Sequence, residues 1–165
     1  MGTTSRSFDW PGAALITAAT LGALALGGLI SAGSDDPWYA ALRKAPLNPP
    51  DIVFAFVWPA LFALMLAGAL MVLYEAGSFK RASAAMGLYF TMLAANVCWS
   101  LFFFGFRDPA VALGVLVALW LLIATTMLRF ALHSPRAALL QVPYLAWVSF
   151  AAYLNGYVWM FNPAP

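Results

Sequence analysis

The chain has 165 residues, of which 64% are hydrophobic, 16% aromatic and 8% charged, and its formal net charge is +2. Soluble domains carry about 25% charged residues, so a chain of this composition lacks the polar surface of a soluble fold and is expected to lie in a lipid bilayer. The small, scattered excess of cations does not indicate a nucleic-acid-binding protein. Cys98 is the only cysteine, which excludes an intrachain disulfide.

Five apolar runs without an ionisable residue predict the membrane-spanning segments. Each reaches the ~20 residues that a helix needs to cross a bilayer core. Barrel strands would be about ten residues long and would alternate in polarity, and these runs do neither. The sequence therefore predicts an all-α integral membrane protein, a single domain over residues 1–165 built as a five-transmembrane-helix bundle. The expected helices are 11–30, 52–74, 82–106, 109–130 and 137–161.

The first run has a second interpretation. Arg6 and the "SAG" at residues 31–33 are similar to the basic region and the cleavage site of a secretory signal peptide. The apolar stretch between them is about 19 residues long, beyond the usual 7–15, so we interpret it as a membrane helix.

The cations predict how the chain lies across the membrane. The N-terminus and the second and fourth connectors share one side, and the first and third connectors share the other. The first side carries five cations, Arg6, Lys80, Arg81, Arg129 and Arg136, and the second carries three, Arg43, Lys44 and Arg107. Because cytoplasmic loops are enriched in Lys and Arg, we expect the N-terminus in the cytoplasm and the C-terminus outside.

The first connector, residues 31–51, has the composition of a structured lid on the outer side. The triplet "DDP" at 35–37 is typical of a helix start, with acids at the positive end of the dipole and Pro in the first turn. The prolines of "APLNPP" end that helix and reduce the entropy lost when the segment is held in one shape. The alternative is a plain connector whose Trp38 and Tyr39 anchor it at the membrane interface.

Aromatic and amide side chains are expected beneath this lid. At about 1.5 Å per residue, Trp58 lies about 9 Å inside its helix, and Trp147 lies near the middle of the membrane. Asn96 and Trp99 share one face of the third helix. An amide in hydrocarbon needs a partner, so Asn96 and Asn155 are expected to face the bundle interior, where they could also simply join helices. Together these residues predict an aromatic cavity for a flat, apolar ligand, although core packing alone remains the alternative for each Trp.

The chain lacks the residues of common catalytic and metal sites. His133 is the only histidine and falls in a connector on the expected cytoplasmic side, and no carboxylates cluster, so no protein metal site is expected. Cys98 is expected to act as a small apolar filler. No charged residue lies near the middle of a predicted span, so nothing indicates a proton or ion relay.

Three stretches carry a resemblance to a known family: "WYAALRKAPLNPPDIVFAFVW" from residue 38, "NVCWSLFFFGF" from residue 96 and "PYLAWVSFAAYLN" from residue 143. They resemble the TSPO/MBR family of tryptophan-rich sensory proteins and translocator proteins, long called peripheral benzodiazepine receptors. The resemblance implies a bacterial cell-membrane protein, commonly a homodimer, that binds porphyrins (protoporphyrin IX or haem) and synthetic benzodiazepine-type ligands beneath the first connector, with no covalently bound cofactor. The ligand-binding residues that it implies are Trp38, Tyr39, Pro50, Trp58, Asn96, Trp99, Trp147, Ala151 and Leu154.

The sequence departs from the family pattern in two places. Leu47 stands where relatives often have Trp, which puts the ligand contact expected there in doubt. Sterol-binding relatives carry a cation after a C-terminal Tyr, whereas Arg136 is the last cation of this chain. We therefore expect cholesterol binding to be weak or absent.

The resemblance leaves three functions open. The first is a receptor-like protein that binds porphyrins in tetrapyrrole sensing, regulation or handling. The second is light-dependent protoporphyrin degradation, for which Trp58 and Trp147 are implied as the catalytic residues. The third is transport of tetrapyrroles or other apolar molecules, against which the lack of an obvious inverted repeat argues. Of these three we predict the first, a binding and regulatory protein, with light-dependent degradation or transport as the alternatives.

Small residues at four-residue spacing offer two candidate dimer faces, since they let helices approach closely. One ridge consists of Gly87, Thr91 and Ala95, and the other of Ala14, Ala18 and Gly22. Packing within the bundle is the alternative use of either ridge. We predict a homodimer through the third helix.

Overall fold

The computed structural model describes residues 8–31 and 33–162. Arg6, one of the cations in the orientation prediction, and the last three residues lie outside this range. Within the described residues every regular element is helical, and five segments are long and apolar enough to cross a membrane. The predicted five-helix bundle is confirmed, and the protein is an integral, multi-pass membrane protein.

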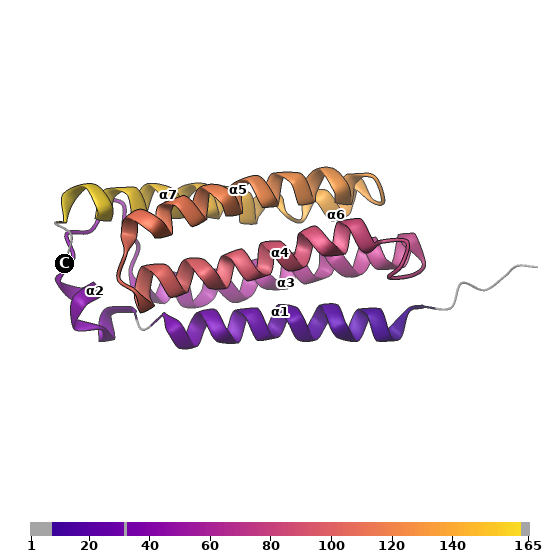
Figure 1. Cartoon of the computed structure of the whole chain (residues 1–165), viewed down its shortest axis with the longest axis horizontal. Helices are drawn as coiled ribbons and strands as arrows, with labels where there is room; N and C mark the ends of the chain where they lie inside the picture. Colours follow the sequence, from indigo (N-terminus) through magenta and orange to yellow (C-terminus); the bar gives the residue numbers. More distant parts are fainter. Residues whose placement is uncertain (1–7, 32, 163–165) are drawn as a thin grey trace, which may run out of the picture.

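The five spans run side by side along the long axis of the molecule (Figure 1). They are α1 (Trp10–Ile30), α3 (Asp51–Ala76), α4 (Ser83–Ser100) continued by the π-helical turn η2 (Leu101–Gly105), α5 (Pro109–Ala131), and α6 (Pro135–Leu139) followed by α7 (Val142–Phe161). The most extensive helix contacts join α4 to α5 and α5 to α7, while α1 packs on α3 and α4. Consecutive spans run in opposite directions, and all the connectors except the first are short.

The last span is interrupted, whereas the sequence analysis expected one continuous helix over 137–161. Pro143 has no N–H to donate to the carbonyl of Leu139, so the helical ladder breaks between α6 and α7. Gln141, which is fully buried at this break, donates from Nε2 toward the carbonyl of Met65 at 3.5 Å. A Cβ added to Gly68 would lie 2.7 Å from that nitrogen and 3.0 Å from the carbonyl oxygen of Ala137, so glycine allows the backbones of the two helices to approach closely here.

Two pairs of polar side chains inside the bundle bond across helices, as an apolar surrounding favours. The Thr20 hydroxyl lies 2.7 Å from the Tyr89 hydroxyl, joining α1 to α4. Asn96 donates from Nδ2 to the Tyr144 hydroxyl at 2.8 Å, joining α4 to α7. Each pair replaces hydrogen bonds to water with one between helices, and so fixes the register of neighbouring spans.

The described part of the first connector, residues 33–50, forms the lid at one end of the bundle (Figure 1). It contains the short helices η1 (Gly33–Asp35) and α2 (Pro37–Ala41), and it shares this end with the start of α3, the turn η2, the start of α5 and the end of α7. Asp36 caps α2 by accepting from the Trp38 N–H at 2.9 Å, with Pro37 in the first turn. The helix start predicted from "DDP" is therefore confirmed.

Candidate ligand-binding cavity

A cavity of about 450 Å³ lies beneath the lid, between α1, α3, α4, η2 and α7. Small-molecule sites in proteins range from about 300 to 1,000 Å³. Its aromatic lining consists of Tyr39, Phe54, Trp58, Phe62, Trp99, Phe103, Phe104 and Trp147. The cavity is thus large enough for an organic ligand, and eight aromatic rings contribute to its wall.

Three tryptophans from three different helices meet on its wall. Trp58 of α3 stacks on Trp99 of α4, with ring centroids 6.0 Å apart and planes inclined by 30°. Trp58 also meets Trp147 of α7 edge to face, at 6.4 Å and 86°. Both arrangements are favourable for aromatic rings, so the three indoles hold one another in place.

The turn η2 brings two consecutive phenylalanines to the cavity. Trp99 contacts Phe103, four residues on, at 5.7 Å, and also Phe104, five residues on, at 6.1 Å. The wider π-helical turn allows both contacts, and such turns recur at functional sites. Phe104 in turn lies 5.4 Å from the ring of Tyr39 in the lid. The lid therefore rests directly on the aromatic wall.

Hydrogen bonds fix the remaining polar groups near the wall. Trp99 donates from Nε1 to Asn155 Oδ1 at 3.1 Å, and Asn155 donates from Nδ2 to the carbonyl of Pro109 at 2.6 Å. Asn96 lines the cavity while it bonds to Tyr144. The two interpretations offered for the asparagines, cavity lining and helix joining, therefore apply together.

The indole N–H of Trp147 differs from that of Trp99. Trp147 Nε1 is fully buried, and no hydrogen-bond partner for it lies among the described residues. Its ring packs on Phe54 at 5.6 Å and on Phe150 at 5.7 Å. Trp147 is therefore held by ring packing alone, at the cost of an unmet donor.

The lid end of the cavity, which we call its mouth, is polar, in contrast to the aromatic wall. Lys44, Asn48, Asp35 and Asp51 line it, and Lys44 Nζ lies 4.1 Å from the centre of the Tyr39 ring, a cation–π distance. Burial raises the pKa of the Tyr39 phenol, and the nearby Asp51 charge raises it further, while a hydrogen bond with Asn48 opposes the rise. The phenol is thus protonated at neutral pH. A ligand that fits this site has an apolar body and a polar edge.

Most residues that the resemblance singled out come together here. Seven of the nine line the cavity: Tyr39, Trp58, Asn96, Trp99, Trp147, Ala151 and Leu154. Among the described residues, Trp38 and Pro50 are not part of the lining. Trp38 instead packs on Phe103 at 5.7 Å, and Pro50 is exposed at the start of α3. The ligand-binding role of all nine stays a prediction.

The sequence analysis missed several lining residues. Phe54 and Phe62 lie four residues before and after Trp58, and Phe103 lies four after Trp99, so helical spacing was a signal for all three. Phe104 reaches the cavity only through the π-helical turn, for which we find no sequence signal. Lys44 and Asn48 lie in the irregular backbone of the lid, where no helical spacing indicates which side chains face the cavity.

Four further residues, Leu47, Cys98, His133 and Trp120, are not part of the cavity lining. Leu47 is exposed on the lid, and Cys98 is exposed on the outside of α4. His133 lies in the connector between α5 and α6, at the opposite end of the bundle. Trp120 is partly exposed and donates to the Ser149 hydroxyl at 3.0 Å. In the part of the chain that the structure describes, no three His, Cys, Asp or Glu side chains are grouped to hold a metal ion.

Comparison with known proteins identifies the family. The sequence model of the TspO/MBR family matches residues 13–160. The chain is 41% identical over 126 residues to the tryptophan-rich protein TspO of Chlorobaculum tepidum, covering 76% of this chain and 80% of that protein. It is 40% identical over 126 residues to the translocator protein of Homo sapiens, covering 76% and 75%, and 39% identical over 120 residues to the tryptophan-rich sensory protein of Cereibacter sphaeroides, covering 73% of each. This membrane protein, with its lidded aromatic cavity, belongs to the TspO/MBR family.

Proposed function

We propose that this protein is a receptor-like membrane protein that binds porphyrins, protoporphyrin IX or haem, non-covalently in the cavity. The observation that carries the proposal is the wall formed by Trp58, Trp99 and Trp147 beneath an ordered lid. A flat macrocycle gains stacking energy on such a wall. The role would be tetrapyrrole sensing, regulation or handling, in keeping with the names of the relatives.

The polarity of the cavity suggests the orientation of the ligand. Burying a carboxylate without partners is costly, so the macrocycle would face the aromatic wall and its carboxylates the polar mouth. The mouth offers Lys44 and Asn48 as donors beside the acids Asp35 and Asp51. His133 is at the far end of the bundle, so stacking and shape, without an axial histidine, would hold a haem. Synthetic benzodiazepine-type ligands would occupy the same wall.

The direct test is a titration of the purified protein with protoporphyrin IX and with haem, followed by tryptophan fluorescence. Porphyrins quench nearby indoles, so we expect saturable quenching at one porphyrin per chain and a smaller quenched fraction in Trp58→Phe. A linear, unsaturable decrease that is equal in both proteins would refute binding in the cavity.

Light-dependent protoporphyrin degradation is the second candidate function. It is favoured by the contact between Trp58 and Trp147, which would place two oxidisable indoles beside a bound porphyrin. Product analysis after illumination separates degradation from binding. Transport, suggested by the name of the translocator relatives, is separated from both by porphyrin flux into sealed vesicles.

We also propose a cytoplasmic N-terminus in a bacterial cell membrane. Lys80, Arg81, Arg129 and Arg136 lie at the end opposite the lid, whereas Arg43, Lys44 and Arg107 lie at the lid end. The lid and the mouth of the cavity would then face outward. We would fuse a reporter enzyme that is active only outside the cytoplasm after the last residue. The fusion should be active, and an inactive fusion would invert the proposed orientation.

Two proposals concern partners. We propose a homodimer through α4, because Gly87 and Thr91 are exposed there and a Cβ added to Gly87 would meet no neighbour.

Cholesterol should bind weakly or not at all, because no cation follows Arg136. Tight, saturable cholesterol binding in detergent would contradict the second proposal.

A further inference from the structure

Arg107 has an unusual backbone conformation at the lid end of the bundle. Its φ of 56° is the only positive value at a non-glycine residue among those described. An L residue in this region is strained and persists only where the surrounding contacts hold it. Arg107 lies between η2 and Asp108, the capping residue of α5. The strained backbone directs attention to the contacts that the Arg107 side chain makes.

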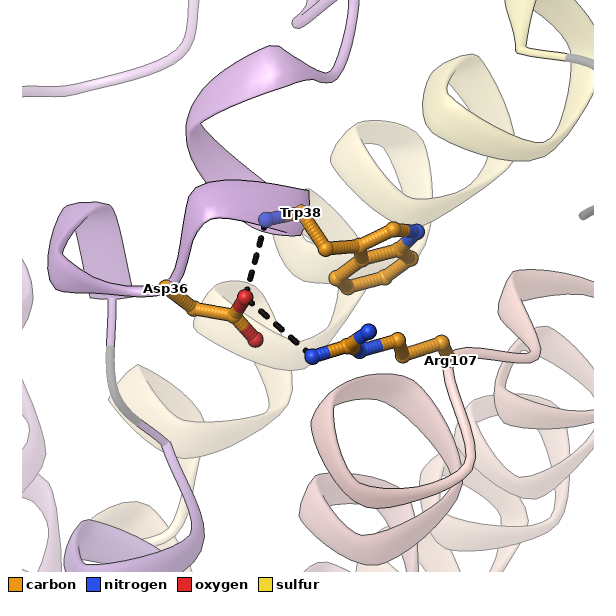
Figure 2. Close-up of polar contacts among 3 residues, drawn as sticks. All are labelled: Asp36, Trp38 and Arg107. Atoms are coloured by element: carbon orange, nitrogen blue, oxygen red, sulfur yellow. Dashed lines mark hydrogen bonds and ion pairs between the residues drawn. The ribbon is translucent and has the colours of Figure 1, made fainter.

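The Arg107 side chain reaches from this connector to the lid (Figure 2). Its Nη2 lies 3.5 Å from Asp36 Oδ1, the same oxygen that accepts the Trp38 N–H and so caps α2. Its guanidinium carbon lies 5.8 Å from the centre of the Trp38 ring. One cation thus contacts the capping carboxylate and the first aromatic ring of the lid helix. The backbone turn that carries it is closed by a hydrogen bond from the Asp108 N–H to the Phe102 carbonyl at 2.9 Å.

The other end of the lid helix is held in a different way. Asn162, just after α7, accepts from the Arg43 N–H at 2.8 Å and donates to the Arg43 carbonyl at 3.1 Å. These bonds involve the backbone of Arg43 and do not depend on its charge. The helix α2 is therefore fixed near Arg43 by two neutral hydrogen bonds and near Asp36 by an ion pair.

We propose that Arg107 is a lid-positioning residue, a latch whose release lets α2 swing away from the cavity about the Arg43 clamp. Because α2 carries Tyr39, which lines the cavity, this movement would open the mouth. The Arg107 side chain is 52% exposed and makes a single contact with Asp36, so the pair is weak and is screened by salt. A weak latch suits a lid that must open and close. Its role in ligand exchange rests on the proposed function.

Four variants separate the ion pair from other effects. Arg107→Gln removes the cation, and Asp36→Asn removes the anion but keeps a good helix cap. Arg107→Lys keeps the charge and should restore most of the latch. Asp108→Asn is the matched control, because Asp108 is a neighbouring capping residue that accepts from Ala110 and Val111 on its own helix.

Two measurements are needed, one of them without ligand. Amide hydrogen exchange of residues 40–42 reports lid opening in the ligand-free protein, and stopped-flow displacement reports the dissociation rate of protoporphyrin IX. We expect Arg107→Gln and Asp36→Asn each to raise both rates about two- to five-fold, the range of an exposed ion pair. Both rates in the double variant should not exceed those in either single variant, and both rates in Asp108→Asn should match those of the wild type. High salt should raise the wild-type rates to the level of the variants.

The outcomes distinguish this inference from the proposed function. Wild-type exchange rates in Arg107→Gln and Asp36→Asn would overturn the latch, whether or not porphyrin binds. If the two variants exchange faster but the wild type shows no saturable porphyrin binding, the latch stands and porphyrin binding is refuted. Faster exchange with an unchanged dissociation rate would show that the ligand leaves by another route, and would overturn the role of the latch in ligand exchange.

Discussion

The indole of Trp99 is fixed on two sides, by stacking on Trp58 at 6.0 Å and by its hydrogen bond to Asn155 at 3.1 Å. These contacts involve α3, α4 and α7, so the cavity wall has its shape before any ligand arrives. A preformed wall favours binding, because fewer side chains must be ordered when the ligand enters.

The first prediction compares the two indole N–H groups. Trp99→Phe leaves Asn155 Oδ1 without its donor and should lower the free energy of unfolding by about 1–3 kcal/mol, the cost of an unmet buried group. Trp147→Phe removes a donor that has no partner among the described residues and should cost less. Thermal unfolding in detergent measures both. An equal loss of stability would show that the Asn155 bond does not hold the wall.

The second prediction concerns light. Trp147→Phe keeps an aromatic ring, so porphyrin affinity should fall by only ~1 kcal/mol. The light-driven loss of porphyrin absorbance should fall much further in Trp147→Phe and in Trp58→Phe, because Phe is far harder to oxidise than Trp. Trp120→Phe is the control, since Trp120 lies outside the cavity and bonds to Ser149. Equal rates of porphyrin loss in the wild type and the three variants would refute the photochemical role of Trp58 and Trp147 and leave the binding function in place.

The overall fold could be predicted because the bilayer leaves few choices. Charge-free runs long enough to span it must be helices, and the five runs gave five spans. The break between α6 and α7 was missed although Pro143 signals it, because the apolar run continues through Gln141. The length of an apolar run does not show that a proline within it lacks the backbone N–H that a continuous helix needs.

The cavity was predictable only in part. Trp58, Trp99 and Trp147 stand out in the sequence, and helical spacing relates each to its neighbours on one face. The π-helical turn that admits Phe104 arises from packing and leaves no pattern. The pair of Asp36 and Arg107 is 71 residues apart in sequence, so only the folded chain brings it together.

The third prediction tests the dimer face. In a Cys98→Ser background, which removes the exposed native thiol, Thr91→Cys should crosslink two chains on oxidation, because the Gly87–Thr91 ridge on α4 would lie at the dimer axis. Ala18→Cys, exposed on the competing ridge of α1, should remain monomeric. Non-reducing electrophoresis of oxidised membranes gives the answer. A dimer at position 18 and none at position 91 would assign the interface to α1.

The fourth prediction follows from Asp9, which caps α1 and joins it to the connector between α3 and α4. Hydrogen bonds from the Phe79 N–H, at 2.7 Å, and from the Gly12 N–H hold the pKa of this carboxyl below its usual value of 3.8. A lowered pKa in the folded state stabilises the protein above the unfolded-state pKa, and this stability is lost as the pH falls through the folded-state value.

The melting temperature of the wild type should therefore fall as the pH drops below about 4, near the unfolded-state pKa of Asp. In Asp9→Asn, which cannot titrate, the melting temperature should be lower at neutral pH and change less in the acidic range. Differential scanning fluorimetry from pH 7 to pH 3 compares them. Parallel curves would show that Asp9 contributes no pH-dependent stability.

The measurement that tests the central claim most directly is porphyrin binding after the cavity has been filled. Ala151 is buried on the α7 side of the cavity, so the ring of Ala151→Phe would occupy the space of the ligand. Ala146→Phe adds the same ring to the exposed face of the same helix and is the matched control. With protoporphyrin IX, we expect saturable binding of one molecule per chain in the wild type and in Ala146→Phe, and at least a tenfold loss of affinity in Ala151→Phe. Equal affinity in all three proteins would contradict binding in the cavity.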